Sequence, residues 1–471
     1  MNGGMSESRR VEMSRLVVVS NRVSLPDEHG SPPPGGMAIA LSAALRRRHG
    51  LWMGWSGKVK AGEDPSGPIS RREAGGINYA LTDLSQTDLD DYYYGFANRV
   101  LWPVFHCRVD LAEYSEARMS GYQRVNRLFA KLLQPLISDD DVIWVHDYHL
   151  IPLAKELRNL GCGNKIGFFL HIPWPAADIL FTVPHYDDLL RGLSCYDLVG
   201  FHTDDDLSNF AECLRRQGLP DPITNGVCQA YGRVFRCGVF PIGIDTAEFE
   251  RLAEQAARSE TLQEPSQRIP GCKVAIGVDR LDYSKGIEKR IVAFDRFLRS
   301  NDHRIGKTQL LQITPKSRTE IPAYLAMQKD VAERVGRVDG ELGTIDWMPV
   351  HYINRSVGPS ELAGLYRMAR VGLVTPLRDG MNLVAKEYVA AQDPQNPGVL
   401  VLSRFAGAAR ELGGAILVNP YDPEATARAI EEALDMQLDE RIDRWRAMIG
   451  RLREYNVYRW CDDFLLGLDQ R

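Results

Sequence analysis

The sequence predicts an α/β protein of two Rossmann-like, doubly wound domains that face a central cleft. Apolar, β-branched runs of strand length alternate with helix-forming segments along the chain. With 471 residues, the chain is longer than one hydrophobic core usually supports, so two domains are expected. Polar links containing glycine follow several of the strands, which is where open α/β sheets bind their ligands.

The boundaries follow from composition. Residues 1–13 lack the apolar core of a signal peptide and are predicted to be a disordered extension, with Met13 as an alternative start. The segment Ser259–Gly271, rich in Glu, Gln, Pro and Ser, is the candidate linker. We therefore expect a first domain over residues 14–258 and a second over residues 259–454.

Composition excludes several classes of protein. A net charge of −5 without a long Lys/Arg run argues against nucleic-acid binding, and no apolar span is long enough for a membrane helix. The eight cysteines form no CxxC pair, which indicates reduced thiols in the cytoplasm. No metal site is expected, because the acidic triplets at Asp139–Asp141 and Asp204–Asp206 offer too few converging ligands.

The first strand, Leu16–Ser20, leads through a long loop to paired glycines and a helix over Met37–Arg47. Glycine lets the backbone approach a phosphate, and a helix start offers free N–H groups, so Gly36 is a candidate anion contact. A plain turn is the alternative. Arg22 lies at the carboxyl end of the strand and could fork onto a phosphate.

Aromatic residues with polar groups come next. Strands are expected at Leu51–Trp55 and Ile77–Leu81, followed by a polar helix over Asp88–Phe96. Packing in the core is the ordinary role of such residues, but Tyr93 and Trp102 could also stack on a sugar or donate to it.

Two further strands end in polar residues. Asp141–His146 places Asp147 at a carboxyl edge, and Ile166–His171 places His171 before a proline-stiffened loop. A histidine satisfied within the core is the alternative for His171. The remaining strands of this half are expected at Asp197–Phe201 and Val234–Ile242.

The second half repeats the alternation. Its loop RLDYSKG puts Arg280 and Lys285 beside a helix start, where two cations and free N–H groups would hold a diphosphate and stabilise it as it leaves. Arg318, after another strand, is a further anion contact. Solvated basic residues are the alternative. The expected strands are Lys273–Val278, Gln309–Thr314, Val371–Thr375, Val399–Leu402 and Ala415–Val418, and the expected helices are Ile287–Leu298 and Ile321–Val335.

The stretch LRDGMNLVAKE, Leu377–Glu387, links a buried strand to a helix over Leu383–Gln392. The turn at Asp379 leads into backbone N–H groups that open the helix without partners of their own. Asp379 and Glu387 would be two acceptors at different depths of one crevice, which suits a polyhydroxylated ligand. Two surface acids are the alternative.

The missing motifs narrow the function. No GxGxxG follows the first strand and no P-loop is present, which removes the dinucleotide-binding and usual kinase interpretations. Glycosyl transfer from a sugar nucleotide fits the cations and the acidic pair best.

The chain resembles the α,α-trehalose-phosphate synthases (UDP-forming), which are retaining glycosyltransferases of the GT-B fold. The matching segments cover nearly the whole chain from Ser14 and include SRLVVVSNR, GGMAIAL, GLWMGWSG, VLWPVFHCR, DDDVIWVHDYHLIPLA, IGFFLHIPWP, RLDYSKG, PLRDGMNLVAKEYVAAQDP and NPGVLVLSRFAGAA. The resemblance implies glucosyl transfer from UDP-glucose to glucose 6-phosphate in trehalose biosynthesis and osmoprotection. It also implies small-molecule substrates, no cofactor, a homo-oligomer, and a C-terminal helix (455–471) that packs back on the first domain.

The resemblance also assigns roles to residues. For the donor, Gly36, Arg280 and Lys285 would meet the diphosphate, His171 and Asp379 the glucose hydroxyls, and Glu387 the ribose, beside the segment Gly380, Met381, Asn382, Leu383 and Val384. For the acceptor, Asp147 would hold glucose hydroxyls, and the phosphate pocket would comprise Arg22, Trp55, Tyr93, Trp102 and Arg318. The catalytic set would be Asp147, His171, Arg280, Lys285 and Asp379. The departing phosphate would accept the acceptor's proton, with Asp147 as an orienting group.

Three alternatives stay open. A glucosylglycerol-phosphate synthase would keep the fold and use ADP-glucose and glycerol 3-phosphate, because backbone groups read the base and the sequence does not resolve them. A catalytically silent sensor would bind a sugar phosphate and regulate a partner. An epimerase or phosphorylase of the same fold would share the diphosphate clamp but lack the acceptor-phosphate set.

Overall fold

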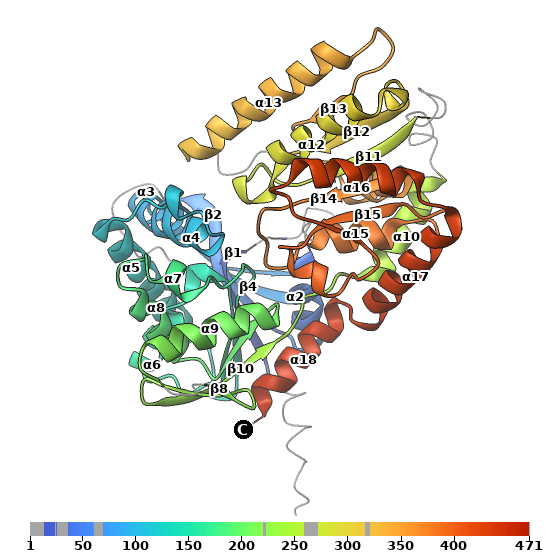
Figure 1. Ribbon diagram of the computed structural model, residues 1–471. Helices are drawn as coiled ribbons and strands as arrows, with labels where there is room; N and C mark the ends of the chain where they lie inside the picture. Colours follow the sequence, from blue (N-terminus) through green and yellow to red (C-terminus); the bar gives the residue numbers. More distant parts are fainter. Residues whose placement is uncertain are drawn as a thin grey trace, which may run out of the picture. The chain divides into compact units, whose positions relative to one another are not determined.

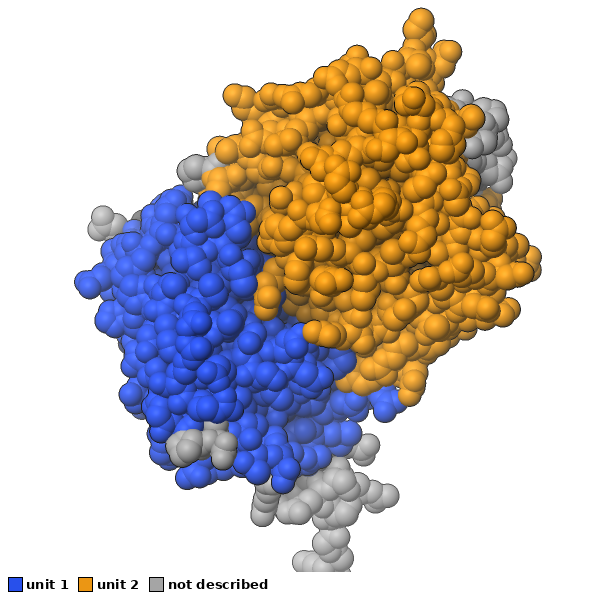
Figure 2. All heavy atoms as spheres, viewed as in Figure 1, with its two compact units in different colours: residues 1–242, 457–471 blue, residues 243–456 orange. Residues whose placement is uncertain are grey.

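The computed structural model describes residues 14–23, 25, 36–60, 69–219, 223–258, 272–315 and 321–470 (Figure 1). Its contacts divide the chain into two compact units, residues 1–242 with 457–471 and residues 243–456, which Figure 2 colours separately. The proposed linker at Ser259–Gly271 lies outside the described residues. Helix α10 (Thr246–Ala257), assigned to the first domain from the sequence, contacts α14 (Pro359–Met368) and α15 (Leu383–Ala391) of the second unit.

The first unit is built on a sheet of ten strands among the described residues, in the order β3-β4-β2-β1-β5-β6-β7-β10-β9-β8. Its seven-strand centre, β4 to β10, is parallel throughout, and antiparallel β3, β9 and β8 form the edges. The strands are β1 Leu16–Arg22, β2 Leu51–Val59, β3 Ser70–Ala74, β4 Ile77–Leu84, β5 Val142–His146, β6 Ile166–Phe169, β7 Leu198–Phe201, β8 Ile223–Thr224, β9 Val227–Ala230 and β10 Arg233–Val239.

The helices of this unit cover both faces of the sheet, so its central strands are buried and almost wholly apolar. They are α2 Gly36–Arg47, α3 Gln86–Asp88, α4 Trp102–Phe105, α5 Glu116–Leu133, α6 Leu153–Asn159, α7 Ala177–Leu180, α8 Tyr186–Leu193, α9 Asp204–Arg216 and α18 Val457–Asp469, with the short 3₁₀ turns η2 Val109–Leu111, η3 Gln134–Leu136 and η4 Tyr148–Leu150.

The second unit has a parallel sheet of six strands among the described residues, in the order β13-β12-β11-β14-β15-β16. This is the Rossmann order 3-2-1-4-5-6. The strands are β11 Lys273–Val278, β12 Thr308–Ile313, β13 Val350–Ile353, β14 Val371–Val374, β15 Val399–Ser403 and β16 Ile416–Val418. The other elements are α12 Ile287–Ser300, α13 Pro322–Leu342, α16 Pro423–Asp435, α17 Leu438–Glu454, and the 3₁₀ turns η5 Tyr283–Lys285, η6 Asp302–Arg304 and η7 Gly407–Arg410.

The strand order reverses at one point within the parallel part of each sheet, and these points locate the ligand crevices. In the first unit the reversal lies between β1 and β5, which end at Arg22 and His146. In the second it lies between β11 and β14, which precede Asp279 and Thr375. The prediction of two Rossmann-like domains is confirmed.

The last helix, α18, packs against α2 and β7 of the first unit. Phe464 is fully buried, and its ring lies over two glycines, Gly167 and Gly200, at which an added Cβ would come within 2.7 and 2.8 Å of the ring. The same ring stacks on Trp144, with centroids 4.5 Å apart and planes 9° apart. Glycine at these two sheet positions makes the groove that the helix fills.

Several segments differ from the prediction. The helix expected over Asp88–Phe96 is a short α3 followed by a π-helix, η1, over Leu89–Leu101. π-Helical turns are rare and are frequently found at functional sites, and η1 carries Tyr93. Strands β3, β8, β9 and β13 were not predicted, because their sequences are short or largely polar.

None of the described helices has both the length and the apolar character needed to cross a membrane. The described residues also contain no group of three His, Cys, Asp or Glu side chains suited to a metal ion. All eight cysteines are free thiols.

Candidate active site

The two predicted donor loops of the second unit meet at the switch point of its sheet. Lys285 Nζ forms an ion pair with Asp379 Oδ2, and only 14% and 12% of these two side chains is exposed. The backbone N–H of Leu377 donates to the carbonyl of Ser284 at 2.7 Å. Residues more than ninety positions apart therefore form one structure, because β11 and β14 are neighbours whose carboxyl ends lie at the same edge.

A third segment supports the Asp379 turn from behind. The N–H of Asp379 donates to the carbonyl of Phe405 at 3.1 Å, and the N–H of Ala408 donates to the carbonyl of Met381 at 2.8 Å. Gly407 lies so close to the carbonyl of Gly380 that a Cβ there would overlap it. The motif SRFAGAA thus shapes the turn, although the sequence reasoning assigned none of its residues a role.

Helix α15 begins at this turn. Asn382, at φ +78°, caps it by accepting a hydrogen bond from the N–H of Ala385 at 3.2 Å, and its amide donates to Asp379 Oδ2 at 3.0 Å. The N–H groups of Leu383 and Val384, in the first turn, have no intrahelical acceptor. The backbone from Gly380 to Val384 is therefore arranged as an anion-binding helix start.

The cations of the two donor loops have different environments. Arg290, fully buried on α12, pairs with Asp279 at 2.7 Å and donates to Thr375 Oγ1 at 3.0 Å. Burial nevertheless raises the pKa of Asp279. Arg290 is thus committed to holding β11 and β14 together. Arg280 is exposed, and no ion pair joins it to another of the described residues.

Glu387 lies in the second turn of α15. Burial of its carboxyl raises the pKa to about 7. The adjacent Lys386 is fully buried and pairs with Glu411, and burial lowers the pKa of that lysine. Because Lys386 is used internally, Glu387 is left as an acceptor without a neutralising cation among its described neighbours.

In the first unit, four of the predicted acceptor residues (Arg22, Trp55, Tyr93 and Trp102) lie in a continuous run of side chains. The guanidinium of Arg22 lies 5.7 Å from the centre of the Trp55 ring, and that ring lies 5.8 Å from Tyr93. Tyr93 stacks on His149, with centroids 5.8 Å apart and planes 13° apart. The run continues through Tyr148, whose ring lies 3.9 Å from His149 and 5.7 Å from Trp102. Six residues from four segments of the chain are thereby brought together.

Sequence reasoning missed the groups that position this run. Asn98 donates to the carbonyl of Tyr93 at 2.7 Å and accepts from the hydroxyl of Tyr148 at 2.8 Å. Gly57, at φ +88°, lies under the guanidinium of Arg22, where a Cβ would meet Nη2 at 2.8 Å. Gly57 is the last residue of the matching segment GLWMGWSG, so the sequence did contain a signal for it, although no role was assigned to this glycine.

Asp147 and His171 are joined at the ends of β5 and β6. The N–H of His171 donates to Asp147 Oδ1 at 3.2 Å, and the N–H of Asp147 donates to the carbonyl of Phe169 at 2.8 Å. Asp147 has φ +74° and ψ 165°, a backbone conformation that costs a non-glycine residue about 1–3 kcal/mol. Strain of this kind is usually retained where the geometry serves a ligand.

The structure adds little about two of the predicted site residues, Gly36 and Arg318. Gly36 is the first residue of α2, so it does stand at a helix start, but Gly35 lies outside the described residues. Arg318 also lies outside them.

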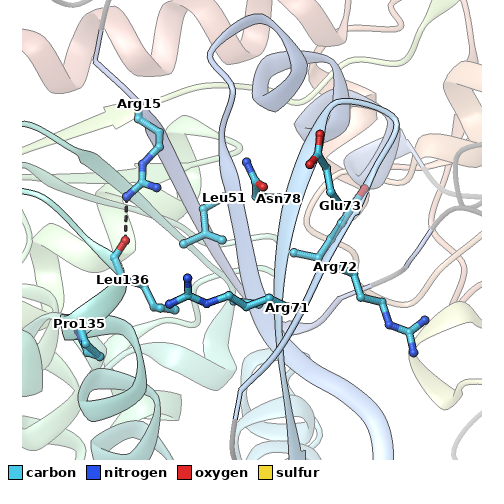
Figure 3. Close-up of a pocket in the computed structure, with 10 residues that line it drawn as sticks. Arg15, Leu51, Arg71, Arg72, Glu73, Asn78, Pro135 and Leu136 are labelled. Carbon is cyan, nitrogen blue, oxygen red and sulfur yellow. Dashed lines mark hydrogen bonds between the residues drawn. The ribbon is translucent and has the colours of Figure 1, made fainter.

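A pocket of about 400 Å³ lies elsewhere, at the amino ends of β1, β2 and β4 (Figure 3). Arg15, on its wall, pairs with Asp141 at 2.5 Å and donates to the carbonyl of Leu136 at 2.7 Å, so its charge is already neutralised. The pocket contains none of the predicted site residues and is at the wrong ends of the strands for a Rossmann ligand.

Known proteins match this chain over almost all of its length. Residues 14–470 match the model of glycosyltransferase family 20. A trehalose-6-phosphate synthase from Sinorhizobium fredii is 60% identical over 457 residues, which cover 97% of this chain and 98% of that protein.

Solved structures agree, and the prediction of a GT-B fold is confirmed. An α,α-trehalose-phosphate synthase (UDP-forming) from Burkholderia xenovorans, in complex with glucose-6-phosphate, is 46% identical with a TM-score of 0.92, over 97% of this chain and 100% of that one. A structure from Escherichia coli, bound with UDP-2-fluoro glucose, is 44% identical with a TM-score of 0.92, over 97% and 99%. The chain belongs to glycosyltransferase family 20.

Proposed function

We propose that this enzyme transfers a glucosyl group from UDP-glucose to glucose 6-phosphate with retention of configuration, giving α,α-trehalose 6-phosphate and UDP. The observation that carries the proposal is the Lys285–Asp379 ion pair at the switch point of the second unit, beside the start of α15, with the exposed Arg280 in the loop after β11. The solved relatives support the substrates, since one is a complex with glucose-6-phosphate and another holds UDP-2-fluoro glucose.

The second unit would bind the donor. Arg280 and Lys285 would hold the diphosphate, assisted by the N–H groups at the start of α15. Asp379 is already oriented by Lys285 and Asn382, and its carboxylate would accept from hydroxyls of the donor glucose. Glu387 would accept from the ribose hydroxyls. A carboxyl with a pKa of about 7 ionises more readily when two hydroxyls donate to it, so binding and ionisation would support each other.

The first unit would bind the acceptor. Arg22 would meet the phosphate, with Tyr93 donating to it and Trp55 and Trp102 walling the pocket. We assign Arg318 to the same phosphate and Gly36 to the donor diphosphate. Asp147 would hold hydroxyls of the acceptor glucose, and His171 would contact a hydroxyl of the donor glucose.

The chemistry follows from the charges. As the glycosidic bond to the nucleotide breaks, negative charge develops on the leaving phosphate, and Arg280 and Lys285 stabilise it. The leaving phosphate takes the proton of the attacking hydroxyl on the same face, so configuration is retained. Asp147 orients the acceptor rather than attacking, unlike the second carboxylate of a retaining hydrolase.

The cellular location and the oligomeric state belong to the same proposal. We place the enzyme in the cytoplasm, because eight free thiols suit a reducing compartment. We also propose a homo-oligomer, by analogy with the family, and light scattering after size-exclusion chromatography would measure the mass directly.

A matrix of donors and acceptors tests the function. UDP-, ADP- and GDP-glucose are each incubated with glucose 6-phosphate and with glycerol 3-phosphate, and products are identified by mass spectrometry. The proposal expects the highest kcat/KM for UDP-glucose with glucose 6-phosphate. Preference for ADP-glucose with glycerol 3-phosphate would instead identify a glucosylglycerol-phosphate synthase, and no product from any pair would favour a silent sensor.

A further inference from the structure

Two histidine rings share one hydrogen bond at the ends of β5 and β6. Nδ1 of His146 lies 3.0 Å from Nε2 of His171, and the rings are stacked with centroids 5.3 Å apart. A single proton lies between the two nitrogens, and it belongs to one ring or the other. Which ring holds it decides what His171 offers to a ligand.

The surroundings of His146 are closed. The side chain is 1% exposed and packs among Trp144 and Trp460, whose ring centres lie 4.6 and 6.4 Å away. Nε2 of His146 is buried, and the described residues supply no hydrogen-bond partner for it. The indole nitrogens of Trp144 and Trp460 are also buried and have no hydrogen-bond partner among the described residues.

These indole groups bear on the position of the proton. An indole N–H can only donate, so the cluster around His146 contains two donors without acceptors. If His146 carried its proton on Nε2, a third buried donor would be left without a partner, and orphaned buried N–H groups are rare in native proteins. A proton on Nδ1 leaves an acceptor at Nε2 and makes a hydrogen bond to His171.

We propose that His146 holds its proton on Nδ1 and donates it to Nε2 of His171, so that neutral His171 carries its own proton on Nδ1. Burial lowers the pKa of both histidines well below the usual value, which keeps both rings neutral. Since Nε2 of His171 is occupied, Nδ1 is the nitrogen left for a ligand. His171 therefore meets its ligand as an N–H donor.

This inference rests on the proposed function in one respect, namely that the ligand at His171 is the donor sugar. An uncharged donor can hold a sugar hydroxyl oxygen without adding positive charge beside a sugar ring that becomes oxocarbenium-like. His146 is then a positioning residue: it touches no substrate and acts through His171. Trp460, on α18, also helps to position His171, since the centres of their rings lie 6.0 Å apart.

The proton position can be observed without any substrate. Nitrogen-15 NMR on the full-length enzyme labelled at histidine distinguishes a protonated Nδ1 from a protonated Nε2, and the His171 signal is assigned by its loss in His171→Gln. We expect a protonated Nδ1 on His171 at pH 7.5. A protonated Nε2 would overturn the proposal.

Two variants separate positioning from packing. His146→Asn keeps an N–H donor near the place of Nδ1, whereas His146→Leu fills similar space without one. We expect His146→Leu to lower kcat/KM for UDP-glucose about tenfold, the scale of one hydrogen bond, and to leave KM for glucose 6-phosphate unchanged. His146→Asn should stay within about threefold of the parent. Equal losses in both variants, or no loss in His146→Leu, would contradict the role.

The two proposals fail separately. If the parent enzyme makes no disaccharide phosphate, the proposed function fails, and the NMR measurement still decides the tautomer of His171. If His146→Leu does not fold, as judged by circular dichroism, the parent NMR spectrum and His146→Asn still decide the question.

Discussion

The carboxyl of Glu387 affects folding and ligand binding in opposite directions, and Glu387→Gln measures both. In the unfolded chain this carboxyl ionises near its ordinary pKa of 4.5, whereas burial raises the folded-state pKa to about 7. Between these two values the folded protein holds the proton more tightly than the unfolded chain. The free energy of unfolding therefore falls as pH rises from about 4.5 to about 7, and the penalty is complete above that range.

The difference between the two pKa values corresponds to at most about 3 kcal/mol at pH 8. Glutamine cannot ionise, so the variant should be more stable than the parent at pH 8 by up to about 3 kcal/mol, and much closer to it at pH 5. The same change removes the carboxylate proposed to accept from the ribose. We expect the Kd for UDP at pH 8 to rise at least about tenfold.

Urea unfolding at pH 5 and pH 8 measures the first effect, and calorimetric titration with UDP measures the second. Glu432→Gln, at an exposed position of α16, is the matched control and should leave the pH dependence of unfolding as in the parent. A Glu387→Gln variant with the same stability difference at both pH values would refute the buried, protonated carboxyl. Unchanged UDP affinity would refute its role in the donor site.

Three other substitutions test the remaining parts of the structure. Arg280→Ala should lower kcat at least a hundredfold, which is the scale for losing one charge-stabilising donor. The control Arg296→Ala loses only an exposed ion pair with Glu424 and should leave kcat unchanged. A near-normal kcat for Arg280→Ala in steady-state assays would rule out its assigned role. Phe464→Ala should lower the free energy of unfolding by about 3–5 kcal/mol in denaturant titrations, because the ring fills the groove over Gly167 and Gly200. The control Leu466→Ala changes a side chain that is 61% exposed on the same helix and should lower it little. Similar losses in both variants would show that α18 is not held by the Phe464 contact. Gly407→Ala should displace the turn at Gly380 and raise KM for UDP-glucose. The control Gly413→Ala adds a Cβ in open space and should leave this KM unchanged. Equal KM values for the two variants would mean that the turn does not depend on the close approach of Gly407 to Gly380.

The sequence determined the class of fold and most strands, because the buried strands of parallel sheets are continuous apolar runs that are visible in one dimension. It also predicted the two loops that we propose bind the donor, since polar residues directly after such strands stand at the ligand edge. It did not determine β3, β8, β9 and β13, whose short or polar sequences carry no clear period. It also did not determine the π-helical form of η1, since a wide helical turn has no distinct hydrophobic pattern.

The partners of each site residue were decided by the tertiary structure. Nothing in the spacing of Lys285 and Asp379 says that they pair, because that contact depends on β11 and β14 lying side by side. The same holds for His146 and His171, which meet across two neighbouring strand ends beneath a helix from the far end of the chain. The residue types that supply charge and hydrogen-bonding groups were readable in sequence, whereas the proton on His171 and the pKa of Glu387 depend on burial, which only the packed chain creates.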